Sequence, residues 1–125
     1  LGGKQADVKD KILKTYLRSG LEPPYFKELA KSLDSDAKRS REVLMHLVNE
    51  GVIVKVKEDL FFHAEAINTL KKKLVKFLEA QAEITTPQFK EMTGVSRKYV
   101  IPLAEYFDST NVTLRVADVR KLRKG

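Results

Sequence analysis

Residues 94–122, GVSRKYVIPLAEYFDSTNVTLRVADVRKL, carry the pattern that decides the fold. Ser96 is a favourable N-cap residue, and the apolar residues that follow it recur at helical spacing. Residues 111–116 then alternate as a strand does, and residues 119–122 return as a second strand after a predicted turn at Ala117 and Asp118. The stretch therefore predicts an amphipathic helix followed by a β-hairpin.

The same order of elements is predicted earlier in the chain. Apolar spacing predicts two helices in the first copy, at residues 7–18 and 25–33. A third helix is expected between the acidic caps Asp34 and Asp36 and the terminating residue Gly51. Two strands follow, at residues 52–56 and 60–63. The second copy begins with a long helix whose apolar positions run from Ile67 to Leu78. Thr86 is expected to cap the next helix, with Pro87 as its first residue.

Two short matches support an internal repeat. FKE at residues 26–28 recurs at residues 89–91, and VIVKV at residues 52–56 is matched by VTLRV at residues 112–116. The two offsets are 63 and 60, and the difference falls where a loop can shorten without cost to the core. The chain is therefore expected to contain two copies of one unit.

Three helices followed by a hairpin are typical of a winged helix-turn-helix. We predict a mainly α fold with small β-hairpin wings, arranged as two tandem winged helix-turn-helix units at residues 1–64 and 65–125. A linker is expected near Ala64 and Glu65.

Composition limits the function classes. The 125 residues include no cysteine, which excludes disulfides, thiolate catalysis and cysteine-based zinc sites and fits a cytoplasmic setting. No window approaches the length of an apolar membrane span. The chain begins LGGKQ rather than with methionine, and we expect it to be part of a longer protein.

Catalytic and metal-binding patterns are not found in the sequence. It has no glycine-rich phosphate loop, no Ser/His/Asp set and no paired carboxylates in a plausible cleft. His46 and His63 lack partners at metal-ligand spacing, so structural roles are expected for both. We predict a binding protein without a metal or cofactor, not an enzyme.

Positive charge gathers in the second copy. Residues 1–64 hold 12 Lys and Arg against 10 Asp and Glu, and residues 65–125 hold 12 against 7, so the net charges are +2 and +5 of the total +7. The cations after residue 95 are Arg97, Lys98, Arg115, Arg120, Lys121, Arg123 and Lys124. They lie at a helix start and in the hairpin, two elements that a winged helix can present together. An anionic partner is expected, with nucleic acid favoured over a membrane surface.

Arg97 and Lys98 occupy a first helical turn, where Asp and Glu are normally preferred because the helix dipole is positive there. The helix N–H groups, the dipole and two cations can together bind an anion, so a phosphate backbone would convert the local penalty into binding. The plain alternative is a pair of solvated surface cations. In the first copy, Asp34 and Asp36 flank the corresponding helix start and complement the dipole.

Other residues of the second copy have two interpretations each. Pro102, inside the predicted helix, is either a tolerated kink or a means of exposing the first turn. Tyr99 could reach a base or sugar, whereas Tyr106 is expected to pack in the core. The lysine run 71–73 with Lys76 is either a solvated face or an extension of a basic track.

The segments SRKYVIPLAEYFD and VTLRVADVRKL resemble the C-terminal end of SelB, the bacterial selenocysteine-specific elongation factor. The last winged-helix unit of that family carries a similar Ser-Arg-Lys-Tyr, then Pro-Leu-x-Glu-Tyr-Phe/Leu-Asp, then a basic wing. Residues 23–28 and 46–55 resemble its penultimate unit. The resemblance spans most of the chain.

The resemblance implies that the second unit recognises a SECIS element, an mRNA hairpin near a UGA codon, and that the first unit is a spacer or docking arm. The full-length factor would bind GTP and selenocysteyl-tRNA through parts that precede this segment. The ribosome is a further implied partner. We expect a cytoplasmic monomer with no membrane partner.

The motif match also implies a set of RNA-binding residues: Ser96, Arg97, Lys98, Tyr99, Arg115, Val116, Ala117, Asp118, Arg120 and Lys121. Within this set, Asp118 is expected to orient an arginine or cap the wing turn. Two residues depart from the family pattern. Ala117 stands where the family often has glycine, so a positive φ there is in question, and Leu114 replaces the first of two wing arginines.

Two other functions fit the same pattern, a tandem winged-helix DNA-binding transcription regulator and a protein–protein adaptor. Direct readout of DNA would place polar readers along the groove-facing side of the third helix, and few are present here. RNA suits the charge layout, because a helix start and a wing can grip a backbone while loop bases supply specificity.

Overall fold

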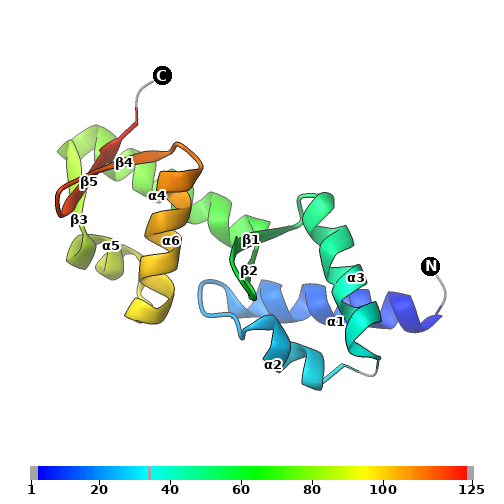
Figure 1. Cartoon of the computed structure of the whole chain (residues 1–125). Coiled ribbons are helices and arrows are strands. Elements are labelled where there is room, and N and C mark those ends of the chain that lie inside the picture. Colours follow the sequence, from blue (N-terminus) through cyan, green and yellow to red (C-terminus); the bar gives the residue numbers. More distant parts are fainter. Residues whose placement is uncertain (1–2, 34, 124–125) are drawn as a thin grey trace. The chain divides into compact units, whose positions relative to one another are not determined.

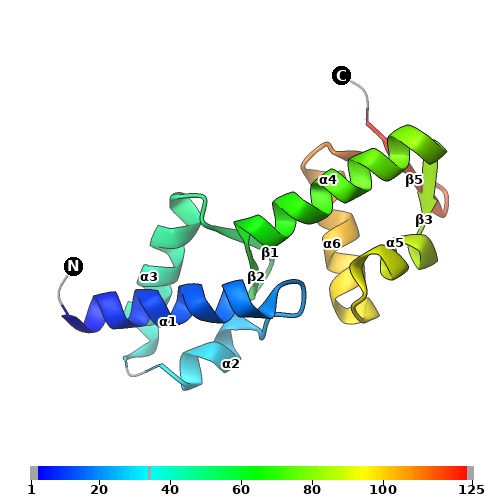
Figure 2. The ribbon, with the colours of Figure 1, turned by 180° about the vertical axis from the view of Figure 1, so that it is seen from behind.

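The computed structural model describes residues 3–33 and 35–123, and Figures 1 and 2 show its elements from two sides. Residues up to Ile67 form one compact unit, and residues from Asn68 form a second. The helices are accompanied by two small antiparallel sheets. The predicted mainly α fold with small β-hairpins is therefore confirmed.

The first unit contains three helices and a two-stranded hairpin: α1 (Gly3–Ser19), α2 (Phe26–Lys31), α3 (Ala37–Asn49), β1 (Ile53–Lys57) and β2 (Leu60–His63). The Asp36 carboxylate caps α3 by accepting the Arg39 backbone N–H at 2.7 Å. Asp34, the other predicted cap, lies outside the described residues. Gly51 follows α3 at φ +80°, a left-handed conformation that glycine adopts without strain.

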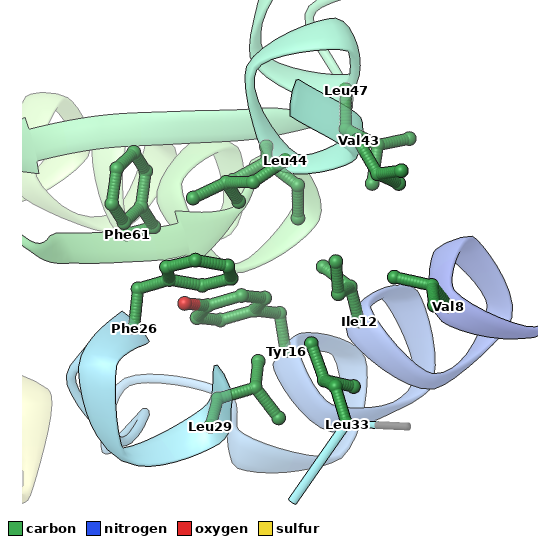
Figure 3. Close-up of a cluster of buried hydrophobic side chains, with 11 residues drawn as sticks. Val8, Ile12, Tyr16, Phe26, Leu29, Leu33, Val43, Leu44, Leu47 and Phe61 are labelled. Atoms are coloured by element: carbon green, nitrogen blue, oxygen red, sulfur yellow. The ribbon is translucent and has the colours of Figure 1, made fainter. Parts of the chain in front are cut away.

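The core of the first unit is built around Tyr16 of α1, as Figure 3 shows. Side chains from all three helices and the hairpin point toward one another there: Val8, Ile12, Tyr16, Phe26, Leu29, Leu33, Val43, Leu44, Leu47, Ile53 and Phe61. Phe26 meets Phe61 edge-on, with ring centroids 6.2 Å apart. Each large side chain buried in this way contributes about 1.5–3 kcal/mol to the free energy of unfolding. Since the apolar residues recur at helical spacing, their burial determines which face of each helix turns toward the core.

From α4 onward the chain repeats this order with one additional strand: α4 (Ala64–Gln81), β3 (Glu83–Thr85), α5 (Thr86–Thr93), α6 (Arg97–Ser109), β4 (Thr113–Val116) and β5 (Val119–Leu122). The division between the two units falls within α4, after Ile67. The three strands form one antiparallel sheet in the order β3-β5-β4. β3 does not appear among the predicted elements, because its three residues include only one buried apolar side chain, Ile84.

Two local predictions are wrong. Thr85, not Thr86, is the N-cap of α5: its hydroxyl accepts the Gln88 N–H at 3.2 Å, and the Gln88 side chain accepts the Thr85 N–H at 2.9 Å. This reciprocal capping box outcompetes a cap one residue later. The expected linker near residue 64 is helical instead, because Ala64 is already the first residue of α4 and the two units divide within that helix.

Candidate nucleic-acid interface

The start of α6 is uncapped by any side chain. Ser96 occupies the predicted N-cap position, at φ −74° and ψ 164°, yet its hydroxyl makes no capping hydrogen bond. Arg97 and Lys98 follow it on the surface, both exposed, and no acidic residue lies in the first turn. The Tyr99 and Val100 N–H groups donate to the Ser96 carbonyl oxygen at 3.0 and 3.1 Å. The positive end of the helix dipole therefore lies beside two exposed cations with no carboxylate in the first turn, a combination that attracts anions.

The N-terminus of α3 is capped by a carboxylate, that of Asp36. Lys38 and Arg39 are exposed in its first turn, so the charges at the two helix starts differ less than predicted. The difference lies in the cap, because Asp36 already satisfies the Arg39 N–H and neutralises part of the dipole. At the start of α6 the Tyr99 N–H donates instead to the Ser96 carbonyl oxygen at 3.0 Å, and Ser96 supplies no charge to offset the dipole.

Tyr99 and Tyr106 lie differently from their predicted roles. Tyr99 is only 9% exposed, which leaves little of its ring to reach a base or sugar, and the Lys98 Nζ atom lies 5.3 Å from its ring centroid. Tyr106 is half-buried and packs edge-on against Phe107 at 5.6 Å. Pro102 is buried inside α6, and the helix continues through it to Ser109.

The wing turn between β4 and β5 holds a left-handed alanine. Ala117 has φ +57°, so the positive φ that the sequence left in question is present without glycine. The Arg115 Nε atom donates to the Ala117 carbonyl oxygen at 3.0 Å, which fastens this arginine across the turn. Val116 is 44% exposed, and Asp118 and Lys121 are also exposed.

Arg120 is held in an ion pair. Its Nε atom donates to both Asp108 carboxylate oxygens at 3.1 and 3.0 Å, and its Nη2 atom lies 3.0 Å from Oδ2. The Thr113 hydroxyl donates to Asp108 Oδ1 at 2.6 Å. The role of orienting an arginine, expected for Asp118, thus falls to Asp108, and Asp118 forms no ion pair with a described residue.

The strand register sorts the wing residues onto two faces. Arg115 lies opposite Arg120, on the face that also carries the buried Thr113. Leu114 lies opposite Lys121 on the other face, where Leu114 is 48% exposed. The structure therefore brings the predicted wing residues into one hairpin, with Arg120 turned toward Asp108 of α6. Lys124 lies outside the described residues.

The remaining candidates have structural roles or lie apart. The His63 Nδ1 atom accepts the Glu65 N–H at 3.1 Å, and His46 lies 3.4 Å from Glu50. Among the described residues, no cluster of His, Cys, Asp and Glu could hold a metal ion. No described helix has the length and apolar character needed to cross a membrane. Lys73 and Lys76 line an open groove of about 610 Å³ between α4 and α5.

Known proteins resemble this chain over much or nearly all of its length. A family model described as elongation factor SelB, winged helix, matches residues 76–122. A selenocysteine-specific elongation factor from Desulfomicrobium baculatum is 30% identical over 124 residues, which are 99% of this chain. The resemblance to SelB is confirmed. The selenocysteine-specific elongation factor of Escherichia coli is 28% identical over 83% of this chain and 17% of its own length.

Two solved structures share the fold. The mRNA-binding domain of elongation factor SelB from E. coli, solved in complex with SECIS RNA, has a TM-score of 0.81 at 23% identity and covers 99% of this chain and all of that one. A bacterial selenocysteine-specific elongation factor, EF-Sec, has a TM-score of 0.66 at 23% identity, covering 95% of this chain and 19% of its own. This chain spans 20% of the length of the Desulfomicrobium relative.

Two features of the candidate site were missed at the sequence level. No role was predicted for Asp108, and its link to Thr113 and Arg120 was not expected. A comparison of the two copies could have found it. At an offset of 60 residues, Asp108 corresponds to Val48 and Thr113 to Ile53, so two polar residues stand where the first copy has apolar ones. The cations Lys38 and Arg39 in α3 were visible but outweighed by the neighbouring acids.

Proposed function

We propose that this chain is an RNA-binding module made of two tandem winged-helix units, and that it recognises an mRNA hairpin of the SECIS type. The second unit is the reader, and the first is a spacer or docking arm. The proposed contacts lie at the start of α6 and in the wing: Ser96, Arg97, Lys98, Arg115, Val116, Ala117, Asp118 and Lys121. Tyr99 and Arg120 support these contacts from within the unit.

The observation that carries the proposal is the open start of α6. Ser96 makes no capping hydrogen bond, and Arg97 and Lys98 stand exposed beside it, whereas Asp36 closes the start of α3. A phosphate group can supply the missing negative charge beside the helix dipole and the two cations. The penalty of a few tenths of a kcal/mol that each cation costs the free helix then becomes part of the binding free energy.

The wing offers a second set of contacts of mixed character. Arg115 and Lys121 are exposed cations, and Val116 presents an exposed apolar surface next to the tight turn. Cations suit phosphates, whereas an apolar side chain can pack against a ribose or an unstacked base. The turn backbone at Ala117 is also exposed and can approach a loop nucleotide.

RNA fits this layout better than duplex DNA does. The cations of α6 lie at its start, and its middle is buried or apolar, so no row of polar side chains is available to read a major groove. The A-form major groove is too narrow for such a helix, and specific RNA readers act instead on loops and bulges. A helix start combined with a wing suits a hairpin whose loop bases are exposed.

By its relation to SelB, the chain is proposed to tether a longer cytoplasmic factor to its mRNA. GTP and selenocysteyl-tRNA would bind elsewhere in that factor, and the ribosome would be a further partner. The 125-residue segment would itself bind as a monomer and carry out no catalysis.

Binding of the segment to a bulged RNA hairpin and to a same-sequence DNA duplex, measured across a range of salt concentrations, tests this function. We expect hairpin preference and a log–log salt slope of roughly −3 to −5, as for about four to six phosphate contacts. Equal binding to the duplex would favour a DNA-binding regulator. A salt-insensitive chain that binds neither nucleic acid would favour a protein–protein adaptor.

A further inference from the structure

We propose that Asp108, Thr113 and Arg120 hold the wing in the orientation needed for RNA binding, and that Arg120 is a positioning residue rather than a phosphate contact. This inference rests on the proposed function and refines its site. One carboxylate connects three elements, because Asp108 lies near the end of α6, Thr113 begins β4 and Arg120 lies in β5.

The geometry leaves Arg120 poorly placed to bind a phosphate. Its side chain is 11% exposed, and both its Nε and Nη2 atoms are engaged by the Asp108 carboxylate. The arginine also lines a small cavity beside the core residues Leu74, Ile84 and Phe107. A phosphate would have to displace a carboxylate that the Thr113 hydroxyl also binds.

In the first unit, apolar side chains occupy the positions that correspond to Asp108, Thr113 and Arg120. The 60-residue offset pairs Asp108 with Val48 and Thr113 with Ile53. The strand registers pair Arg120 with Phe61, because Arg115 lies opposite Arg120 as Lys55 lies opposite Phe61. Ile53 and Phe61 are fully buried in the core, and Val48 packs against it.

A winged-helix hairpin therefore does not need this polar network to pack. Burying an ion pair costs desolvation and commonly yields no more stability than an apolar replacement does. Hydrogen bonds depend on direction, whereas apolar contacts tolerate small rotations. The network thus fixes the angle between β4, β5 and α6, and with it the positions of Arg115 and Lys121 relative to the start of α6.

The test measures hairpin affinity for the whole chain and its variants. Asp108→Asn keeps the side-chain shape but removes the charge, and we expect about tenfold weaker binding, because a wing that swings free loses its contacts. In that background Arg115→Ala should have less than about a twofold effect, against about tenfold in the unchanged chain, while Arg97→Ala keeps its full effect. Glu105→Gln, an equal change of charge at an exposed site on α6, is the matched control.

A graft of the first unit's solution, Asp108→Val with Thr113→Ile and Arg120→Phe, separates positioning from stability. We expect the graft to melt no lower than the unchanged chain yet bind the hairpin about tenfold more weakly. Full affinity in the graft would mean that the network only stabilises the unit and would overturn the proposal. Unchanged or tighter binding by Asp108→Asn would show that a freed Arg120 contacts phosphate, which also overturns it.

Hairpin binding by the unchanged chain separates a failure of the proposed function from a failure of the positioning role. If it binds the hairpin and the variants behave otherwise than expected, only the positioning role fails. If it does not bind the hairpin at all, the proposed function fails and the positioning role fails with it.

Discussion

Arg115 donates through Nε to the carbonyl oxygen of Ala117 at 3.0 Å, across a turn in which Ala117 itself is left-handed at φ +57°. The contact ties a wing cation to the backbone of the turn. It also means that the turn keeps its shape although it lacks the glycine that such a φ favours. The strain is borne locally, at an exposed position that glycine could fill.

Ala117→Gly is expected to stabilise the second unit by about 1 kcal/mol, or roughly 4–8 °C in Tm, because relief of the left-handed strain exceeds the added entropy of the unfolded chain. Ala82→Gly at φ +71°, just after α4, is a matched variant and should give a similar gain. Thermal unfolding followed by circular dichroism measures both. A loss of stability in either would show that the left-handed alanine carries no strain.

The cap of α5 can be assigned by a pair of threonine variants. Thr85→Ala removes the hydroxyl that accepts the Gln88 N–H and should cost about 1 kcal/mol. Thr86→Ala changes the first helical residue without touching the capping box and should cost at most a few tenths. Equal losses in denaturant unfolding would contradict the assignment of Thr85 as the cap.

Tyr16 makes the first unit sensitive to alkali. Its hydroxyl is buried without a hydrogen-bond partner among the described residues. Burial first, and the negative charge of Asp59 second, raise its pKa above the ordinary value of 10.0. An unfolded tyrosine ionises near that value while the folded one stays neutral, so its contribution to stability is intact below about pH 10 and falls as the pH rises further.

Tyr16→Phe should therefore match or exceed the unchanged chain by about 1 kcal/mol at neutral pH, because an unsatisfied buried hydroxyl is removed. Its advantage should widen above about pH 10. Denaturant unfolding of both proteins across this pH range measures the difference. Parallel pH curves for the two chains would show that Tyr16 ionises as readily folded as unfolded.

Arg97 should contribute one phosphate contact. Arg97→Ala is expected to weaken hairpin binding and to reduce the log–log salt slope by about one. Lys11→Ala removes the same charge from an exposed position of α1 and should leave the slope unchanged. If both variants shift the slope equally, the chain attracts RNA only through its net charge.

Most of the fold could be predicted because its signals are local or periodic. The apolar spacing from Val8 to Tyr16 gave α1 its buried face, and Gly51 marked the end of α3. The strand pattern at residues 111–116 and the turn at Ala117 and Asp118 located the wing, whose first strand begins at Thr113. Among the described elements, β3 was not predicted. Its three residues are too few to show a periodic pattern, and the strand is recognised by its pairing with β5, which lies far along the chain.

The candidate site was less accessible from sequence, because it depends on which side chains meet. Tyr99 and Tyr106 lie seven residues apart on α6, and this spacing alone does not determine which ring is buried more deeply. The pairing of Asp108 with Arg120 spans twelve residues and requires the hairpin to fold back onto the helix. Charge counting treated Arg120 as a free cation for the same reason.

The measurement that tests the central claim most directly is the hairpin affinity of Ser96→Asp. An aspartate here copies the cap that Asp36 gives α3, so the chain should become more stable by about 0.5–1 kcal/mol while its hairpin affinity falls by about tenfold or more, because the carboxylate occupies the proposed phosphate position. Asn111→Asp adds the same charge beyond the other end of α6 and should change affinity by less than about threefold. Equal affinities for Ser96→Asp and the unchanged chain would contradict the claim that the start of α6 binds the RNA backbone.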